Sequence, residues 1–165
     1  MTAEDLNALK KELEETKKRI QVLEDIEAIK KLKAFYAKAC DAKYDPDMMM
    51  EVFTEDAVWD GGKEFGVHRG RKEIYNFFKG VSDSLVFALH YFIAPDIAVE
   101  GDKAHGRWYM WQIATMKGNK AAWVAAFEDD KYEKIDGRWW MKEMKLTLLF
   151  MTPYEEGWHK KRLMD

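Results

Sequence analysis

The sequence predicts an α+β fold in which helices pack on the concave side of a curved antiparallel sheet. Two observations lead to this prediction. Apolar residues recur at helical spacing in the first half of the chain, and after Ser84 the pattern changes to long runs separated by hairpin-turn signals. Helices followed by successive hairpins are typical of α+β domains, and strands this long must twist and bend.

Three turn signals divide the second half of the chain into long strands. The signals are Glu100-Gly101-Asp102, Lys117-Gly118-Asn119 and Ile135-Asp136-Gly137, each at hairpin spacing. The predicted strands cover residues 84–99, 103–116, 120–134 and 138–150. A shorter strand, Ala57–Asp60, extends the sheet and is closed by a turn at Gly61-Gly62.

The first half of the chain predicts four helices. Residues 4–24 carry a short apolar seam of Leu6, Leu9, Leu13, Ile20 and Leu23, interrupted at Thr16. Three heptads alone are marginal, so this helix should lean on its own domain or on a partner subunit. We therefore divide the chain into an N-terminal helical extension, residues 1–24, and one domain, residues 25–165.

A second predicted helix spans residues 25–41, and two shorter ones follow. The third begins after the cap residue Asp45 with Pro46 in its first turn, and carries Met48, Met49, Met50 and Phe53. The fourth runs from Gly70 to about Val81, with Ile74, Phe77 and Phe78 facing inward.

Composition excludes several classes of protein. Hydrophobic residues make up 47% of the 165 residues and charged residues 35%, which indicates a globular chain. The net charge of −3 gives no electrostatic footprint for nucleic acid. No run approaches the ~20 apolar residues of a membrane span. The charged N-terminus is unlike a signal peptide, and the single Cys40 suits a reducing compartment, so we expect a cytoplasmic protein.

Strand alternation predicts a cavity walled by aromatic side chains. Aromatic residues make up 14% of the chain, including seven Trp, and these fill either a plain core or a ligand cavity. We assign inward the alternating residues of each strand, and expect Trp59, Trp108, Met110, Trp123 and Phe127 to form the walls. In the last strand, the set Trp140, Met144, Leu146, Leu148 and Phe150 shares one face. Gln112 is the lone polar residue on its face, so it is either a core network member or a ligand contact.

Three side chains form a workable acid–base set that needs no cofactor. Tyr36 lies in the apolar stripe of the second helix, and His90 lies inside the first long strand. An imidazole can take and return a proton near neutral pH, and a carboxylate such as Asp41 can orient it. Asp41 is about 140° around an ideal helix from Tyr36, so it joins the set only if the helix ends or bends near Cys40. Otherwise Asp41 is a solvated carboxylate at the helix end.

Metal chemistry has no support in the sequence. The four histidines, His68, His90, His105 and His159, show no ligand spacing. We expect His68, His105 and His159 to lie on the surface, and predict neither a metal nor a cofactor.

Several segments form a recognisable pattern together with the helix that carries Tyr36 and Asp41. They are Phe53–Trp59, His68–Ile74, Ala88–His90, Gly106–Tyr109 and Lys131–Gly137. With these segments the chain resembles the SnoaL-like family of the nuclear transport factor 2-like superfamily over roughly residues 25–150. The pattern is most similar to bile-acid 7α-dehydratases, and also resembles scytalone dehydratases and hexachlorocyclohexane dehydrochlorinases. The resemblance implies a cone-shaped, cofactor-free lyase, commonly trimeric, that abstracts a proton with a His–Asp pair. Tyr36, Asp41 and His90 fall on the family's active-site positions.

Two positions depart from the bile-acid dehydratase pattern. Gln112 stands where a second pocket Asp would be, and Leu148 stands where a pocket Arg would be. Gln112 cannot exchange a proton, and Leu148 cannot hold an anion. We therefore expect a neutral, hydrophobic, aromatic or polycyclic substrate that loses water or a small fragment such as formaldehyde.

Two alternatives remain open at this point: an isomerase or cyclase that uses the same residues, and a cone that binds a hydrophobic ligand without catalysis. Tyr109 and Trp111 on the outer face of the sheet need cover. We therefore expect a homo-oligomer, a trimer first and a dimer next.

Overall fold

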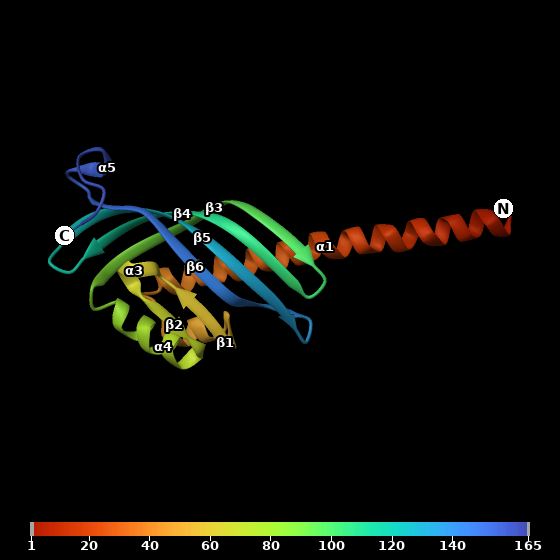
Figure 1. Cartoon of the computed structure of the whole chain (residues 1–165), viewed down its shortest axis with the longest axis horizontal. Helices are drawn as coiled ribbons and strands as arrows, with labels where there is room; N and C mark the ends of the chain where they lie inside the picture. The colour runs from red at the N-terminus through yellow and green to blue at the C-terminus, as the bar shows by residue number, and fades with distance from the viewer. Residues whose placement is uncertain (1, 165) are drawn as a thin grey trace.

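The computed structural model describes residues 2–164 and has the predicted α+β architecture, with an open, curved six-stranded sheet (Figure 1). The helices are α1 (Ala3–Asp41), α2 (Pro46–Met50), α3 (Gly62–Phe65), α4 (Gly70–Val81) and α5 (Gly157–Lys160). The strands are β1 (Phe53–Asp60), β2 (Val67–Arg69), β3 (Leu85–Glu100), β4 (Lys103–Met116), β5 (Lys120–Ile135) and β6 (Arg138–Pro153). Their order in the sheet is β2-β1-β6-β5-β4-β3.

The four long strands pair as successive antiparallel hairpins, as the turn signals predict. Gly101, Gly118 and Gly137 each adopt a positive φ in their turns, which explains why glycine stands there. β1 runs parallel to β6 and antiparallel to β2. Two details of the prediction were wrong: Phe53 begins β1 rather than belonging to the third helix, and Gly62 opens the short helix α3.

The two helices predicted before residue 41 form one continuous helix, α1, so the predicted division into two helices was wrong. Thr2 caps α1 and forms a reciprocal capping box with Asp5. The first half of α1 projects beyond the sheet (Figure 1), and its apolar seam is exposed, with Leu9 at 53% and Leu23 at 63%. Burial starts at Asp25 and continues through Ile29 and Leu32. The helix continues unbroken past residue 24, and residues 3–24 differ from the rest of α1 in their exposure.

β6 contains two extra residues that change which of its side chains face inward. Lys142 and Leu149 each have no direct partner in β5, so the alternation of β6 shifts at both points. As a result Trp140 lies on the outer face, where Arg138 stacks on its ring, and Phe150 also points outward, against Trp158. The assignment of these two residues to the inner face was wrong, whereas Met144 and Leu146 are buried as predicted.

The inner face of β5 was also assigned to the wrong set of residues. Met110 pairs with Ala126 and Gln112 pairs with Val124, and directly paired residues share a face. The even-numbered residues of β5 therefore point inward with those of β4. Trp123 and Phe127 lie on the outer face, where Phe127 packs edge-on against Tyr109 at 4.8 Å between ring centroids.

α1 is fixed to the sheet at Asp25 by buried polar contacts. The Trp139 indole donates to its carboxylate at 2.9 Å, and the Lys134 ammonium lies 2.6 Å away. Burial alone would raise the pKa of Asp25, but the bonds from Lys134 and Trp139 outweigh it and lower that pKa. Among the described residues, no helix has the length and apolar character to cross a bilayer.

We expect Asp25→Ala to lower the free energy of unfolding by about 1–3 kcal/mol, because Trp139 and Lys134 lose a buried acceptor. Glu24→Ala changes an exposed neighbour on the same helix and should leave stability near that of the wild type. Urea unfolding followed by circular dichroism measures both. Equal stability of the two variants would show that this contact does not hold the helix to the sheet.

Candidate active site

A cavity of about 390 Å³ lies between the end of α1, α4 and the inner face of the sheet. Its apolar wall includes Trp59, Phe65, Phe77, Phe78, Met110, Val124, Leu146 and Leu148. Polar groups are few and are contributed by Tyr36, Cys40, Tyr44, Ser84, His90, Gln112 and Glu128. An apolar cavity with a few convergent polar groups is the usual form of a small-molecule site.

His90 and Asp41 form a close pair at one side of this cavity. Oδ1 of Asp41 lies 2.9 Å from Nδ1 of His90, and it also accepts the backbone N–H of His90 at 2.9 Å. The His90 side chain is 5% exposed and lines the cavity, whereas Asp41 is 29% exposed and lies behind it. Asp41 reaches His90 because α1 ends at this residue, as the pairing requires. Asp41 is thus paired with His90 and is at the same time a partly exposed carboxylate at the helix end.

Tyr44 completes a hydrogen-bonded chain that the sequence did not predict. Its hydroxyl lies 3.2 Å from Nε2 of His90 and accepts from the Gln112 amide at 3.2 Å. An ionised carboxylate can only accept, so Nδ1 of a neutral His90 carries the ring proton and Nε2 accepts from Tyr44. Nε2 is thus the basic atom of the ring, and Gln112 is both a network member and a cavity-lining residue.

Tyr44 is held in this position, against backbone strain, by its hydrogen bonds and by stacking on Phe78. Lys43 and Tyr44 adopt φ values of 61° and 58°, in the left-handed region. For residues other than glycine this costs on the order of 1–3 kcal/mol each, and such strain gathers at functional sites. Tyr44 follows the helix end, where periodicity predicts nothing about side-chain direction. This explains why the sequence pattern missed it.

Tyr36 faces the cavity as predicted from its place in the apolar stripe of α1. Its hydroxyl accepts a hydrogen bond from the Trp59 indole at 3.2 Å. Burial, together with the nearby Cys40 and Glu128, raises the pKa of Tyr36 well above its ordinary value. The phenol therefore stays protonated and can serve as a hydrogen-bond donor.

Only part of the predicted aromatic wall lines the cavity. Trp59, Met110, Gln112 and Leu148 do, whereas Trp123 and Phe127 lie on the far face of the sheet. Trp108 points inward as predicted but belongs to the core, where its indole donates to the Tyr132 hydroxyl at 2.9 Å. Part of the aromatic wall comes instead from α4, through Phe77 and Phe78.

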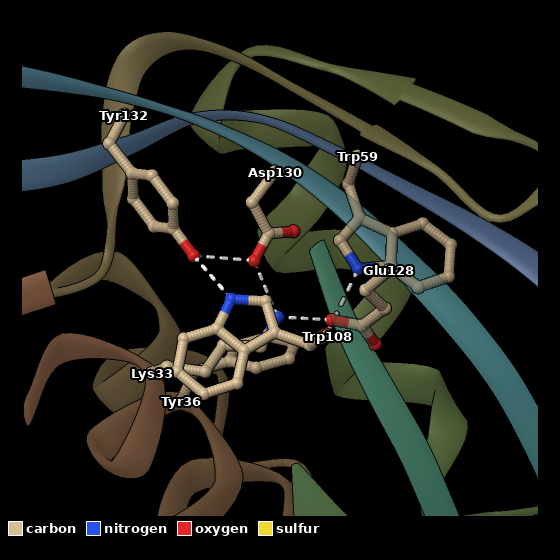
Figure 2. Close-up of polar contacts among 7 residues, drawn as sticks. All are labelled: Lys33, Tyr36, Trp59, Trp108, Glu128, Asp130 and Tyr132. Atoms are coloured by element: carbon tan, nitrogen blue, oxygen red, sulfur yellow. Dashed lines mark hydrogen bonds and ion pairs between the residues drawn. The ribbon is translucent and has the colours of Figure 1, made fainter. Parts of the chain in front are cut away.

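A buried charged cluster beside the cavity was also missed (Figure 2). Lys33 of α1 lies between the carboxyl groups of Glu128 and Asp130, and all three side chains are at most 2% exposed. The Lys33 ammonium donates to Glu128, and to Asp130 at 2.7 Å. Tyr132 donates to the same Asp130 oxygen at 2.6 Å. Glu128 and Asp130 occupy the same strand face as Val124 and Ala126, so this face could be recognised only from the strand register.

Burial perturbs the ionisation of every member of this cluster. It raises the pKa of Glu128 to about 7, despite the nearby Lys33. Burial also raises the pKa of Asp130, against the opposing effects of Lys33 and Tyr132. For Lys33, burial favours the neutral form, but the two carboxylates outweigh it and raise the pKa. Lys33 therefore stays charged, while Glu128 binds a proton near neutral pH.

The other histidines lie away from His90. His105 and His159 are exposed as expected. The expected surface position of His68 was wrong, because its ring is half-buried and stacks on Phe77 at 4.2 Å. No group of three or more metal-ligating side chains is arranged around a common point within residues 2–164.

Comparisons with known proteins identify the fold. Residues 21–145 match the family model of the SnoaL-like domain. A solved structure from Novosphingobium aromaticivorans, with a proposed aromatic ring hydroxylase activity, is 28% identical and superposes with a TM-score of 0.74 over 79% of this chain and 94% of that one.

Two further solved structures share the fold at lower identity. A type 3 hexachlorocyclohexane dehydrochlorinase from Novosphingobium barchaimii is 22% identical, with a TM-score of 0.72 over 79% of this chain and 90% of that one. A proposed scytalone dehydratase from Novosphingobium aromaticivorans is 21% identical, with a TM-score of 0.73 over 80% of this chain and 89% of that one.

We expect Leu148→Trp to weaken binding of the neutral aromatic probe 2-naphthol by about tenfold or more, equivalent to roughly 1.4 kcal/mol. The larger side chain fills the cavity that Leu148 lines. The matched control is Leu149→Trp, the same change at the next residue, which is 42% exposed. Calorimetric titration measures both affinities. If Leu149→Trp weakened binding as much as Leu148→Trp, the probe would not occupy this cavity.

The pKa of Glu128 also predicts a pH dependence of stability. Its pKa rises from an ordinary 4.5 to about 7 in the folded chain, so the folded state binds more protons between these values. Its contribution to stability is present below pH 4.5 and is lost as pH rises through about 7. We expect this pH-dependent part of the urea unfolding midpoint to be absent in Glu128→Gln. It should still be present in Glu133→Gln, which changes another glutamate of the same strand. A wild-type pH profile in Glu128→Gln would contradict the assignment.

Proposed function

The chain belongs to the SnoaL-like family, and from this premise we propose that it is a cofactor-independent lyase. His90 is the general base, Asp41 orients it, and Tyr36 stabilises the negative charge that develops on the substrate. The reaction is an elimination that releases water or a small fragment such as formaldehyde. The observation that carries the proposal is the 2.9 Å His90–Asp41 contact at the wall of an apolar cavity.

The hydrogen-bond chain supports the role of His90. Asp41 fixes the proton on Nδ1 and stabilises the imidazolium that forms when Nε2 takes a proton. In the free protein the Tyr44 hydroxyl donates a hydrogen bond to Nε2. A substrate proton therefore reaches Nε2 either after Tyr44 moves aside or by transfer through the Tyr44 hydroxyl. Gln112 supports Tyr44 from the other side and exchanges no proton itself.

The cavity wall supports a neutral, hydrophobic, aromatic or polycyclic substrate. Among the described lining residues there is no Lys or Arg to bind an anionic group, and Leu148 adds apolar surface. Trp59, Phe77 and Phe78 offer ring faces and edges to an aromatic ligand. This favours the neutral substrate class over a bile acid, and the likeness to bile-acid dehydratases stays a prediction.

Two other readings use the same cavity. An isomerase or cyclase would move a proton between the same residues without a leaving group, and product analysis separates it from a lyase. A non-catalytic cone would bind the ligand and leave it unchanged. The complete Asp41–His90–Tyr44 chain favours chemistry over binding alone, because binding an apolar ligand needs no oriented base.

We also propose a homo-oligomer, a trimer before a dimer, and a cytoplasmic location. The exposed outer face of the sheet supports association. Tyr91, Ile93 and Tyr109 lie on neighbouring strands and are about half exposed, at 50%, 54% and 48%. Apolar surface of this kind is commonly covered by a second subunit.

We expect His90→Ala to abolish turnover while 2-naphthol still binds. Loss of a general base costs on the order of 10²–10⁴ in rate. The screen incubates the protein, without added cofactor, with neutral hydroxylated aromatics that include scytalone, and reads products by mass spectrometry and a formaldehyde assay. His105→Ala, an exposed histidine on β4, is the control and should retain full activity. Wild-type turnover in His90→Ala would end the proposal.

A further inference from the structure

The Lys33 cluster carries one more carboxyl group than its cation can neutralise. With all groups ionised, Lys33, Glu128 and Asp130 sum to one negative charge at a site that is at most 2% exposed. Burying an uncompensated charge is unfavourable, so a group in this position takes up a proton instead. The cluster is therefore expected to hold one proton shared between its two acids.

The contacts favour Glu128 over Asp130 as the acid that holds the proton. One oxygen of Asp130 accepts from both Lys33 and Tyr132, at 2.7 and 2.6 Å, and such bonds stabilise a carboxylate. Glu128 accepts from Lys33 alone among the described residues. Among the described residues, the second oxygen of Asp130 is buried without a partner.

Besides burial, the charge of Asp129, the neighbour of Asp130 in β5, raises the pKa of Asp130. The titratable side chains that face the cluster are Tyr36 and Cys40 of α1, Tyr44 after α1, and Tyr132 of β5. Burial raises the pKa of each of these four groups, so all remain neutral near neutral pH. Lys33 and Asp130 thus provide the charges that set the protonation of Glu128.

Glu128 is the member of the cluster that faces the cavity. It lines the same cavity as His90 and Tyr36, whereas Lys33 and Asp130 lie outside that lining. It is also the only carboxyl group among the described lining residues. Figure 2 shows Glu128 on the side of the cluster next to Trp59, whose indole bonds to Tyr36.

We propose that Glu128 is the general acid of this cavity, a neutral carboxylic acid that gives its proton to a leaving hydroxyl group, so that the substrate is an alcohol. Lys33 and Asp130 are positioning residues that keep this proton in place. The inference rests on the proposed lyase function, because it supplies the acid that an elimination of water requires.

The step balances without an added reagent. Nε2 of His90 takes a proton from a substrate carbon, and the electron pair of that C–H bond becomes the new C=C bond. The neighbouring C–O bond breaks, and its electron pair stays on the oxygen, which takes the Glu128 proton and leaves as water. Glu128 is then a carboxylate beside Lys33, and His90 an imidazolium beside Asp41. Proton exchange with solvent returns both groups to their starting states.

The protonation of Glu128 can be measured without a substrate. The protein is labelled with carbon-13 at the side-chain carboxyl of glutamate, and the Glu128 resonance is identified by its loss in Glu128→Gln. We expect this resonance at the position of a neutral carboxyl group near neutral pH, moving to the carboxylate position as pH rises. A resonance at the carboxylate position throughout neutral pH overturns the proposal. Glu128→Gln leaves Lys33 paired with Asp130, so the variant should fold.

The acid role is tested by changing the leaving group. The alcohol found in the screen is compared with its chloride, because chloride leaves without a proton. Glu128→Gln should lower kcat for the alcohol by about 10²–10⁴ and change kcat for the chloride by less than about tenfold. His90→Ala should lose both activities. If His90→Ala loses both while Glu128→Gln retains the alcohol reaction, the acid role fails and the lyase proposal stands. If His90→Ala keeps both, the lyase proposal itself fails.

Discussion

The contact between Lys33 of α1 and the two acids of β5 fixes how the helix lies on the sheet. A buried ammonium is tolerated only where carboxylates surround it, so this helix has one acceptable depth and rotation against the strands. Tyr36 and Cys40 follow Lys33 on the same helix face and therefore point into the cavity. Asp41 lies at the end of the same helix, beside His90. The Asp25–Trp139 contact fixes the other end of the buried segment. Two polar anchors on one helix thus place most of the site.

The cavity remains open because its aromatic groups contact one another along its wall. Trp59 packs on Phe77 at 4.5 Å and edge-on against Phe78 at 5.6 Å, while its indole holds the Tyr36 hydroxyl. Gly61 is essential to this arrangement, since a Cβ there would lie 2.4 Å from the Trp59 ring. On the side of the base, Tyr44 is held by hydrogen bonds with His90 and Gln112 and by stacking on Phe78 at 6.2 Å, and these contacts offset its backbone strain. Phe78 packs against both Trp59 and Tyr44, so it links the two sides of the site.

The sequence predicted the fold, but its periodicity left the place of Asp41 open, and only the resemblance to the SnoaL-like family put Asp41 beside His90. Gly101, Gly118 and Gly137 locate the hairpins because these turns require positive φ, and Tyr36 follows from helical periodicity. The wall of the cavity was harder to predict. Alternation within one strand does not say which face is inner. Hydrophobicity misled because β5 buries Glu128 and Asp130 on its inner face and leaves Trp123 half-buried on the outer one. In β6, Lys142 and Leu149 shift the alternation without any sequence signal. Tyr44 and Lys33 depend on contacts between distant segments, which local patterns do not contain.

Three buried tryptophan side chains contact α1, the helix that carries much of the site. Trp59 bonds to Tyr36, Trp139 bonds to Asp25, and the Trp108 ring lies 5.7 Å from the Lys33 ammonium. All three contact α1 and are at most 5% exposed. Trp158, at 52%, belongs instead to α5, which lies at the end of the sheet away from the projecting half of α1 (Figure 1). The emission of these three indoles is therefore sensitive to any separation of the helix from the sheet. The chain carries an intrinsic optical signal for the integrity of its own active-site scaffold, readable without a label or a substrate.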